Sequence, residues 1–445
     1  MPPNLFGGIF YCPFTIEILI RSAILRRTSS IRGASCYGKC QKAALRLGSG
    51  GCLLYYDGFS LGLFNLTFGL YQVPVTESTS LNRAQFSTVI TFRMIVSAVL
   101  CFFFGTINHR ISLRKLASIG MFTLSLALII MSKSSTPIMF YLGGILGGIG
   151  LGFSAGTAAT AFINNWFISH RGLVLGIVLA ASGFGGAVFS KVVSYFIVTY
   201  GWRNSYAFAS AAMFAVAIIV VLFIREKPSD MGLSPIVSHD YVAPQKASGD
   251  MPGMTVSEAL RSPVLYILML TFFLIGFIDS PIYTAYPSRM SDMGIAVAIS
   301  STLVSTMQIF NASSKIMLGS INDKFGVFPA LCICSVCNLA GLVIMLTART
   351  PFQFALFAVI FGISIPLENI MTSFVVSRVF GRKSSNTFIG VAYAFVAFGA
   401  GISNPLMGKC YDTFGSYDNM LYCCLFISVL VSSTLVILIK KSKFE

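Results

Sequence analysis

Six ionisable side chains interrupt stretches of sequence that are otherwise apolar. They are Asp57, Arg93, Lys191, Asp279, Lys315 and Glu368. A charged group inside a hydrocarbon layer is costly, so such a group usually faces a partner, a ligand or a proton pathway. These six residues are therefore the first candidates for binding a charged ligand, carrying a proton or forming ion pairs.

The composition explains why these charges stand out. Of the 445 residues, 55% are hydrophobic and only 10% are charged, and the mean hydropathy is +0.80. Most of the surface must therefore face lipid. The net charge of +16 is spread over alternate loops and forms no basic patch with interleaved aromatics, so we do not expect nucleic-acid binding.

The sequence lacks the groups of residues that catalysis or metal binding requires. The chain has only three histidines, no Ser/His/Asp array and no phosphate-binding loop. Many of the eleven cysteines stand in apolar runs, where a thiol behaves as a small hydrophobe. We therefore expect no enzyme activity, no cofactor and no metal site.

Arg93 and the three acidic residues among these six can have a structural role as well as a functional one. We expect Arg93 to pair with Asp57 or Glu368, and Asp57 to lie near the membrane edge. Asp279 stands beside Pro281, where a helix break can place a coupling carboxylate, although a structural hydrogen bond explains it equally well. Glu368 leaves the same two alternatives open.

Polar neighbours suggest which other side chains reach a cavity. Lys191 has Ser190 and Ser194 near it, so it can face the interior of a bundle. Aromatic residues mostly pack or face lipid. Four tyrosines stand out as candidate cavity walls: Tyr71, Tyr283, Tyr286 and Tyr393.

The elements that must position these residues are twelve predicted membrane-spanning helices of an all-α fold, since about 20 apolar residues cross a bilayer. They are expected near 52–72, 86–107, 116–133, 138–164, 172–199, 205–224, 263–284, 297–319, 328–348, 351–376, 387–408 and 418–439. Residues 143–203 are dense in glycine, which lets helices approach backbone to backbone.

The spans divide the chain into two six-helix halves. We expect a basic, poorly ordered extension over 1–50, halves over 51–225 and 262–440, a linker over 226–261 and a short tail over 441–445. Lysine and arginine gather in the two termini, the linker and alternate loops. Because positive charge stays cytoplasmic, both termini and the linker are predicted to face the cytoplasm, with a cell-membrane location expected.

A shift of 214 residues superimposes the two halves. Five glycines meet five others at this one offset, among them Gly105 with Gly319 and Gly201 with Gly415. Two parallel repeats of this kind form transporters in which one half rocks against the other around a midplane site.

The chain resembles the major facilitator superfamily from about residue 50 onward. The superfamily loop after helix 2 reads Gly-x-x-x-Asp-Arg/Lys-x-Gly-Arg/Lys. The second half matches it at Gly319, Asp323, Lys324 and Gly326, and the first half matches only at Gly105 and Arg110. The resemblance implies that the charges and the turn of this loop form a latch between helices on the cytoplasmic side. This latch is expected to be weaker in the first half.

Within the superfamily, the chain is most similar to the monocarboxylate porter and oxalate:formate antiporter group. The signature residues are Trp166, Arg171, Gly172, Gly201, Trp202 and Arg203. In that group helix 8 carries an arginine four residues before the loop glycine, where this chain has Lys315. An aspartate often stands one turn earlier, where this chain has Asn311.

The resemblance implies a secondary transporter of a small, monocarboxylate-like organic anion, coupled to a proton or a counter-anion and active as a monomer. Its expected substrate-binding residues are Lys315, Asn311, Lys191, Tyr283 and Tyr393, and its coupling or ion-pair residues are Asp279, Glu368, Arg93 and Asp57. Alternatively, Lys315 extends to the cytoplasmic face. A polyspecific metabolite or drug exporter and a non-transporting sensor remain the competing functions.

Overall fold

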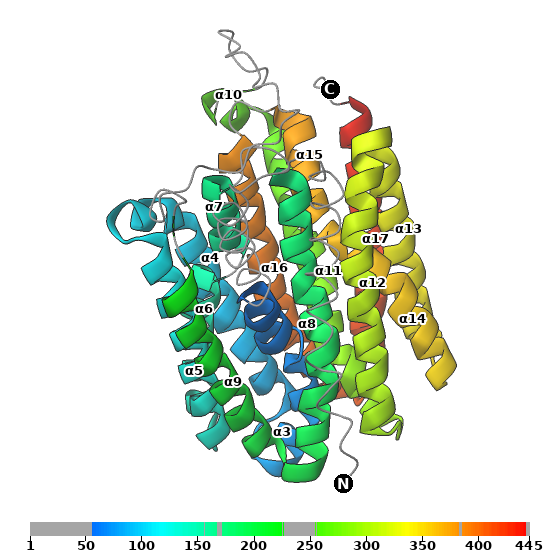
Figure 1. Ribbon diagram of the computed structural model, residues 1–445. Helices are drawn as coiled ribbons and strands as arrows, with labels where there is room; N and C mark the ends of the chain where they lie inside the picture. Colours follow the sequence, from blue (N-terminus) through cyan, green and yellow to red (C-terminus); the bar gives the residue numbers. More distant parts are fainter. Residues whose placement is uncertain are drawn as a thin grey trace, which may run out of the picture.

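The computed structural model describes residues 56–154, 156–166, 171–224, 226, 254, 256–381 and 385–441. In these residues the chain is a bundle of long, roughly parallel helices (Figure 1). The expected extension over 1–50 lies outside the described residues. So do most of the 226–261 linker and of the 441–445 tail.

The first half crosses the bundle six times. Its first passage is built from three short pieces, and residue 155 of the fourth lies outside the described residues. The elements are η1 (Gly58–Asn65, a π-helix), η2 (Phe68–Tyr71, a 3-10 helix), α3 (Gln72–Ser78), α4 (Arg83–Arg110), α5 (Leu113–Lys133), α6 (Pro137–Ser154), α7 (Gly156–Trp166), α8 (Arg171–Tyr200) and α9 (Trp202–Phe223).

The second half repeats this order after the short helix α10 (Val256–Leu260), and a 3-10 segment interrupts its fourth passage. The elements are α11 (Pro263–Asp292), α12 (Val297–Phe325), α13 (Val327–Thr347), α14 (Pro351–Ser364), η4 (Ile365–Leu367, a 3-10 helix), α15 (Ile370–Phe380), α16 (Ser385–Phe414) and α17 (Asp418–Lys441). The predicted all-helical fold is confirmed.

Ten helices in the described part of the chain are long and apolar enough to cross a membrane. Two of the twelve expected passages are not among them. The first passage is too broken, and α12 is rich in hydroxyl and amide side chains such as Ser305, Gln308 and Asn311. These exceptions are informative because polar or broken passages occur where a membrane protein lines an internal cavity.

Local sequence signals set the helix starts. Asn82 accepts a hydrogen bond from the Gln85 backbone N–H at 2.8 Å, and the Gln85 side chain accepts one from the Asn82 N–H at 3.1 Å. Thr350 and Gln353 form the same capping box at the start of α14, where Pro351 occupies the first turn. Each box satisfies backbone donors that a helix start leaves free.

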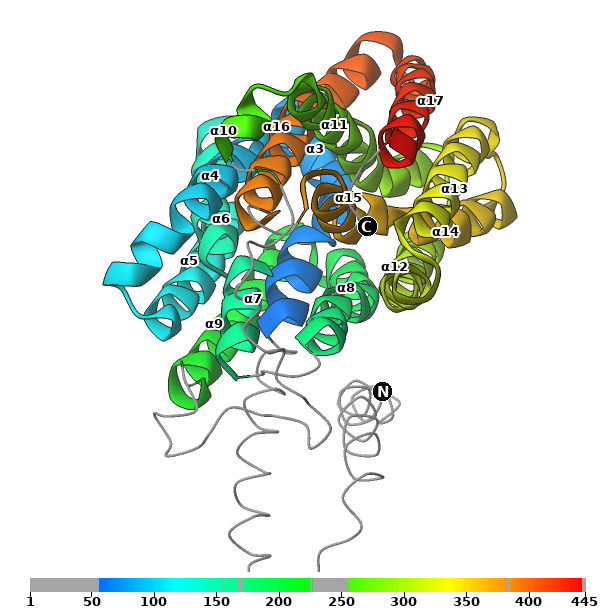
Figure 2. The same ribbon diagram turned by 90° about the horizontal axis from the view of Figure 1, so that it is seen from above.

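The two halves meet along two seams, α4 against α16 and α8 against α12 (Figure 2). Glycine makes both seams close. A Cβ on Gly408 would lie 2.7 Å from the backbone nitrogen of Ala84, and one on Gly183 would lie 2.9 Å from the Gln308 carbonyl oxygen. Side chains at these positions would force the halves apart, in agreement with the close backbone approach that glycine density predicts.

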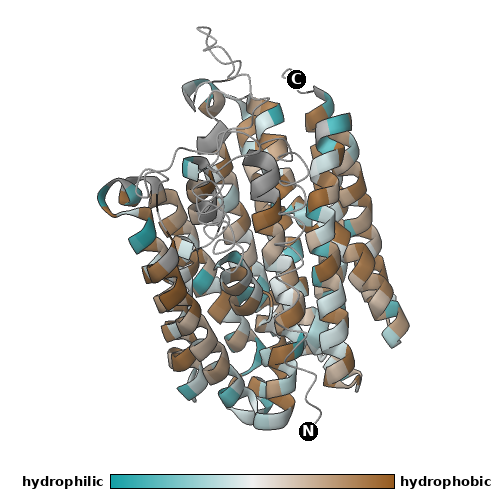
Figure 3. Cartoon of the chain, viewed as in Figure 1, coloured by the Kyte–Doolittle hydropathy of each residue, from teal (hydrophilic) through white to brown (hydrophobic). Residues whose placement is uncertain are grey.

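Apolar residues cover the middle of the bundle, and hydrophilic residues gather toward the helix ends (Figure 3). Large apolar side chains such as Phe102, Leu222 and Phe426 are exposed. Exposed apolar surface on this scale has no counterpart in soluble monomers and fits a lipid-facing exterior.

The expected helix break at Pro281 is wrong. α11 runs without interruption from Pro263 to Asp292 and contains both Pro281 and Pro287. The breaks lie instead in the first passage and around Pro366. A proline inside a helix removes one backbone hydrogen bond, and packing on several sides keeps the helix continuous here.

A candidate binding cavity between the two halves

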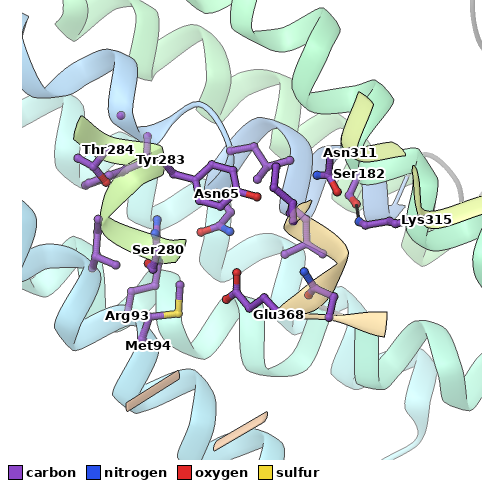
Figure 4. Close-up of a pocket in the computed structure, with 17 residues that line it drawn as sticks. Asn65, Arg93, Met94, Ser182, Ser280, Tyr283, Thr284, Asn311, Lys315 and Glu368 are labelled. Atoms are coloured by element: carbon purple, nitrogen blue, oxygen red, sulfur yellow. Dashed lines mark hydrogen bonds between the residues drawn. The ribbon is translucent and has the colours of Figure 1, made fainter. Parts of the chain in front are cut away.

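A cavity of about 120 Å³ lies between the two halves (Figure 4). Both halves contribute polar and charged side chains to its wall. The first half supplies Asn65, Arg93 and Ser182, and the second supplies Ser280, Tyr283, Thr284, Asn311, Lys315, Glu368 and Asn369. A wall shared in this way must change when the halves move relative to one another.

Broken helices border this cavity from both sides. Phe68 and Gly69 of η2 line it in the first half. Ile365 of η4 and the adjoining Glu368 and Asn369 line it in the second. Non-helical backbone at membrane depth is tolerated where it lines a cavity, and discontinuous helices commonly form transport sites.

Lys315 crosses the α8–α12 seam and does not extend to the end of the bundle. Its Nζ donates to the Leu179 carbonyl oxygen at 3.2 Å and to Ser182 Oγ at 3.5 Å, and the residue is 8% exposed. Its charge also interacts with the carboxyl groups of Asp57 and Glu368. Lys315 is thus held between the halves and lies within electrostatic reach of two acids.

Asp57 is fully buried just before η1. Its carboxyl group interacts with Ser182 and with the ammonium of Lys315. A buried carboxylate depends on such partners for stabilisation. Asp57 therefore supports Lys315 from outside the cavity wall.

Arg93 does not form the expected ion pair with Asp57 or Glu368. Ion pairs in the described part of the chain include Arg83–Asp292 and Arg289–Asp418, and neither of them involves Arg93. The guanidinium of Arg93 lies instead over the rings of Phe68 and Phe64, at 4.9 Å and 5.7 Å from their centroids. Glu368 interacts with Lys315, which accounts for the missing pair.

Asn311 and Tyr283 are two of the expected substrate-binding residues. Both line the cavity. The Asn311 amide donates to Gln308 Oε1 at 3.1 Å, and Asn311 Oδ1 has no partner among the described residues. Asn311 therefore keeps one acceptor free at the wall.

Three other expected site residues lie outside the cavity wall. Lys191 is exposed on α8. The Tyr393 hydroxyl donates to the carbonyl oxygen of the cavity residue Asn369 at 2.7 Å. Asp279 is 1% exposed and accepts a hydrogen bond from Asn338 at 2.8 Å, inside the second half.

Tyr71 and Tyr286, two of the four candidate wall residues, are packing residues. Tyr71 stacks on Tyr206 with 3.8 Å between ring centroids, and its hydroxyl lies 2.9 Å from Ser205 Oγ. The Tyr286 hydroxyl donates to the Phe354 carbonyl oxygen at 3.0 Å. Both side chains are almost completely buried, so their polar tips are satisfied inside their own halves.

Several cavity residues escaped the sequence analysis. Asn65, Ser182 and Asn369 are polar residues inside or beside apolar stretches, and none of them was predicted to line the site. A polar side chain inside an apolar stretch is the signal that could have identified them. Amides and hydroxyls give this signal as charges do, because they too are uncommon on a lipid-facing helix surface.

An ion pair and neighbouring hydrogen bonds tie the halves together at the end of the bundle that holds α3, the lower end in Figure 1. Arg83 Nη1 donates to Asp292 Oδ2 at 2.7 Å, and Arg83 also donates to the Tyr417 hydroxyl. Asp412 accepts from the backbone N–H groups of Arg83 and Ala84, at the positive end of α4. This arrangement holds the first half against α11 and α16 below the cavity.

The Gly201-Trp202-Arg203 corner joins α8 to α9 and has a structural role. Gly201 has φ of 80°, which favours glycine. Trp202 Nε1 donates to Ser78 Oγ at 2.6 Å, and Arg203 Nη1 donates to the Ser134 carbonyl oxygen at 2.9 Å. The corner thereby fixes four passages of the first half relative to one another.

The remaining motif residues lie toward the end that holds α10. Gly105 and Arg110 are in α4, Trp166 ends α7, Arg171 and Gly172 begin α8, and Gly319, Asp323 and Lys324 are in α12. Gly326 ends α12 with φ of 84° and so provides the turn of the expected latch. The charge contacts of that latch involve side chains that the structure does not describe.

Comparison with known proteins gives consistent matches. A family model described as Major Facilitator Superfamily matches residues 54–402 and, in a second alignment, 268–444. The chain is 23% identical over 406 residues to the uncharacterized MFS-type transporter YcxA of Bacillus subtilis (strain 168), covering 88% of this chain and 95% of that protein. It is 24% identical over 364 residues to monocarboxylate transporter 12-B of Danio rerio, covering 77% and 76% of the two chains.

Among solved structures, that of the nucleoside transporter NupG has the same fold. The TM-score is 0.68 at 15% sequence identity, and the match covers 88% of this chain and 99% of that one. At this identity the likeness shows the fold alone.

Proposed function

Because the chain belongs to the Major Facilitator Superfamily and is a membrane transporter, we propose that it moves a small organic anion through the cavity by alternating access. The observation that carries this proposal is the pair of cations in the cavity wall. Arg93 comes from the first half and Lys315 from the second, and neither is in contact with a carboxylate among the described residues. An anion between them would be attracted by both halves at once.

Electrostatics favours an anion at this place. In a medium of low dielectric constant, two opposite charges a few ångströms apart attract far more strongly than in water. The cavity also offers neutral donors, among them Asn65, Tyr283 and Asn369. Such groups can satisfy the remaining oxygen lone pairs of a bound carboxylate.

The size of the cavity favours a small substrate. Its volume of about 120 Å³ is less than the roughly 150 Å³ cavity that accepts benzene. A carboxylate with a short aliphatic chain fits this space. Apolar wall residues such as Leu61, Ile90 and Met94 suit the chain of such a ligand.

Glu368 is the best candidate for coupling, because it is the acid that lines the cavity. With Arg93, Lys315, Asp57 and Glu368 all ionised, these four charges sum to zero. Binding of a monoanion would make the sum negative, and a proton on Glu368 would restore it. In this scheme, proton symport follows if Glu368 releases the proton in each cycle. Anion exchange follows if the protein changes between its two open conformations only with an anion bound.

The expected orientation belongs to the same proposal. With the linker side cytoplasmic, the Arg83–Asp292 cluster closes the extracellular end of the bundle. The pathway lies within one chain, so a monomer suffices.

The test is uptake of labelled formate, acetate, lactate and oxalate into proteoliposomes, first under an imposed pH gradient and then with internal anion. Uptake driven by the gradient identifies proton symport, and uptake that needs internal anion identifies exchange. If no carboxylate moves under either condition, the proposal is wrong and the exporter or sensor alternatives take its place.

A further inference from the structure

We propose that Arg93, and not Lys315, binds the carboxylate of the substrate directly. This inference rests on the proposed function and assigns the anion contact within the same cavity. Arg93 and Lys315 lie at opposite sides of the cavity, with Glu368 between them in the view of Figure 4. Their surroundings differ in a way that separates their roles.

Arg93 is a buried cation with unused donors. It is 2% exposed, and its Nε and Nη1 atoms have no hydrogen-bond partner among the described residues. An ionised group in such a place is costly unless an opposite charge and hydrogen bonds compensate it. A carboxylate ligand would supply both, because a guanidinium matches the geometry of a carboxylate.

Aromatic rings hold the guanidinium without neutralising it. Phe68 and Phe64 lie under its charge, and Phe68 also lines the cavity. Behind it, α6 approaches so closely that a Cβ on Gly148 would lie 2.6 Å from the Arg93 carbonyl oxygen. The base of the side chain is therefore fixed while its charge remains available, which limits the entropy that binding would cost.

Lys315 is occupied in this conformation. Its ammonium donates to the Leu179 carbonyl and to Ser182, and its charge faces both Asp57 and Glu368. A substrate carboxylate placed there would meet two acids of like charge. Lys315 thus neutralises the acidic side of the site, which leaves the anion contact to Arg93.

This division of roles predicts which substrates are accepted. A monoanion needs one cation and can place its carboxylate at Arg93 and its short chain toward Ile90 and Met94. A short dicarboxylate would have to bring its second charge toward Glu368. Monoanions such as acetate and lactate are therefore expected to bind more tightly than oxalate.

The test measures thermal stability and uptake for the full chain and three variants, with the same four carboxylates as probes. R93M removes the charge and keeps much of the side-chain volume, R93K keeps the charge without the planar fork, and R349M removes an exposed arginine far from the cavity as a control. Losing a charge-assisted contact weakens binding about ten- to a hundredfold.

We expect R93M to melt at or above the wild-type temperature without ligand, because an uncompensated buried charge is gone. It should also lose the ligand-induced rise in melting temperature and show KM at least about tenfold higher. R93K should fall between R93M and the wild type, and R349M should match the wild type.

Two outcomes would overturn the inference. If R93M melts well below the wild type or fails to fold, Arg93 is a structural residue. If R93M keeps the wild-type KM and ligand-induced stabilisation, the carboxylate binds elsewhere. A wild-type protein that neither binds nor moves any of the four carboxylates would instead refute the proposed function.

Discussion

The arginines at the lower end of the bundle and the cations of the cavity wall have opposite surroundings. At the lower end, Arg83 contacts Asp292 at 2.5 Å, and Arg289 contacts Asp418 at 2.6 Å. In the cavity, Arg93 lies over aromatic rings, and Lys315 donates to a carbonyl and a hydroxyl. Basic residues are thus paired with carboxylates at the lower end of the bundle, and they lack a contacting carboxylate among the described residues where a ligand would bind.

The difference between these two regions shows how the interface between the halves can be closed and still respond to a ligand. Paired charges satisfy each other and stabilise one arrangement of the halves. Uncompensated charges in a cavity make the stability of that arrangement depend on a ligand, because the ligand supplies the missing charge. Substitutions in the cavity wall and in the ion pairs at the lower end both test this contrast, and their expected effects differ in size.

The largest effect should come from adding a fixed negative charge to the cavity. Asn65 lines it, so Asn65→Asp would place a carboxylate where the anion binds. A like charge a few ångströms away costs about 2 kcal/mol or more at partly buried sites. We expect carboxylate uptake at low substrate concentration to fall at least about thirtyfold. Asn65→Ala, which removes the amide without adding charge, is the control and should lose much less.

Neutralising the acid that lines the cavity should change coupling more than binding. Glu368→Gln cannot release a proton, so under the proposed scheme uptake should no longer respond to a pH gradient, while exchange of internal for external anion should persist. Asp279→Asn is the matched control, because Asp279 lies outside the cavity wall and its amide can still accept from Asn338. If Asp279→Asn loses gradient-driven uptake and Glu368→Gln keeps it, the roles of these two acids are reversed.

Removing a paired arginine should loosen the lower end. Arg83→Met leaves Asp292 without its partner, and the two side chains are only 10% and 22% exposed. We expect a loss of about 1–3 kcal/mol from the closed arrangement. Spin labels placed across the α4–α16 seam should report a larger fraction of molecules open at that end, and the Arg83→Asp, Asp292→Arg exchange should restore part of the closure. An unchanged distance distribution would show that this cluster does not control closure.

The smallest effect is expected for the more exposed pair. Asp418 is 35% exposed at its contact with Arg289, so solvent screens the interaction. Asp418→Asn should lower stability by less than about 1 kcal/mol and leave uptake kinetics within about twofold of the wild type. A loss as large as that of Arg83→Met would contradict the distinction between the two pairs.

Much of the fold followed from the sequence because hydrophobic length and glycine spacing are local signals. The superfamily resemblance is confirmed, and ten of the twelve expected spans are helices long and apolar enough to cross a membrane. The helix break was misplaced at Pro281 because a proline alone does not end a helix whose neighbours support it. The break at Pro366 occurs where the chain also turns into a 3-10 segment at the cavity.

The site was harder to predict because side-chain partners depend on three-dimensional packing. The sequence identifies Arg93, Lys315 and Glu368 as charges within spans, and the structure places all three in one wall. It gives no sign that Phe64 and Phe68 lie under Arg93, since these residues come from another passage. Lys191 was linked to the cavity by neighbouring serines and Tyr393 by its aromatic type, and neither feature determines the direction in which a helix face points.

The most direct test of the proposed binding site is a crystal structure of the protein with (methylseleno)acetate, a small and unreactive monoanion whose selenium gives an anomalous signal. We expect one selenium peak inside the cavity, with the ligand carboxylate in hydrogen-bond contact with the guanidinium of Arg93. A carboxylate bound at Lys315 would contradict the assignment of Arg93. A peak outside the cavity, or no peak at concentrations that saturate uptake, would contradict the proposed binding site itself.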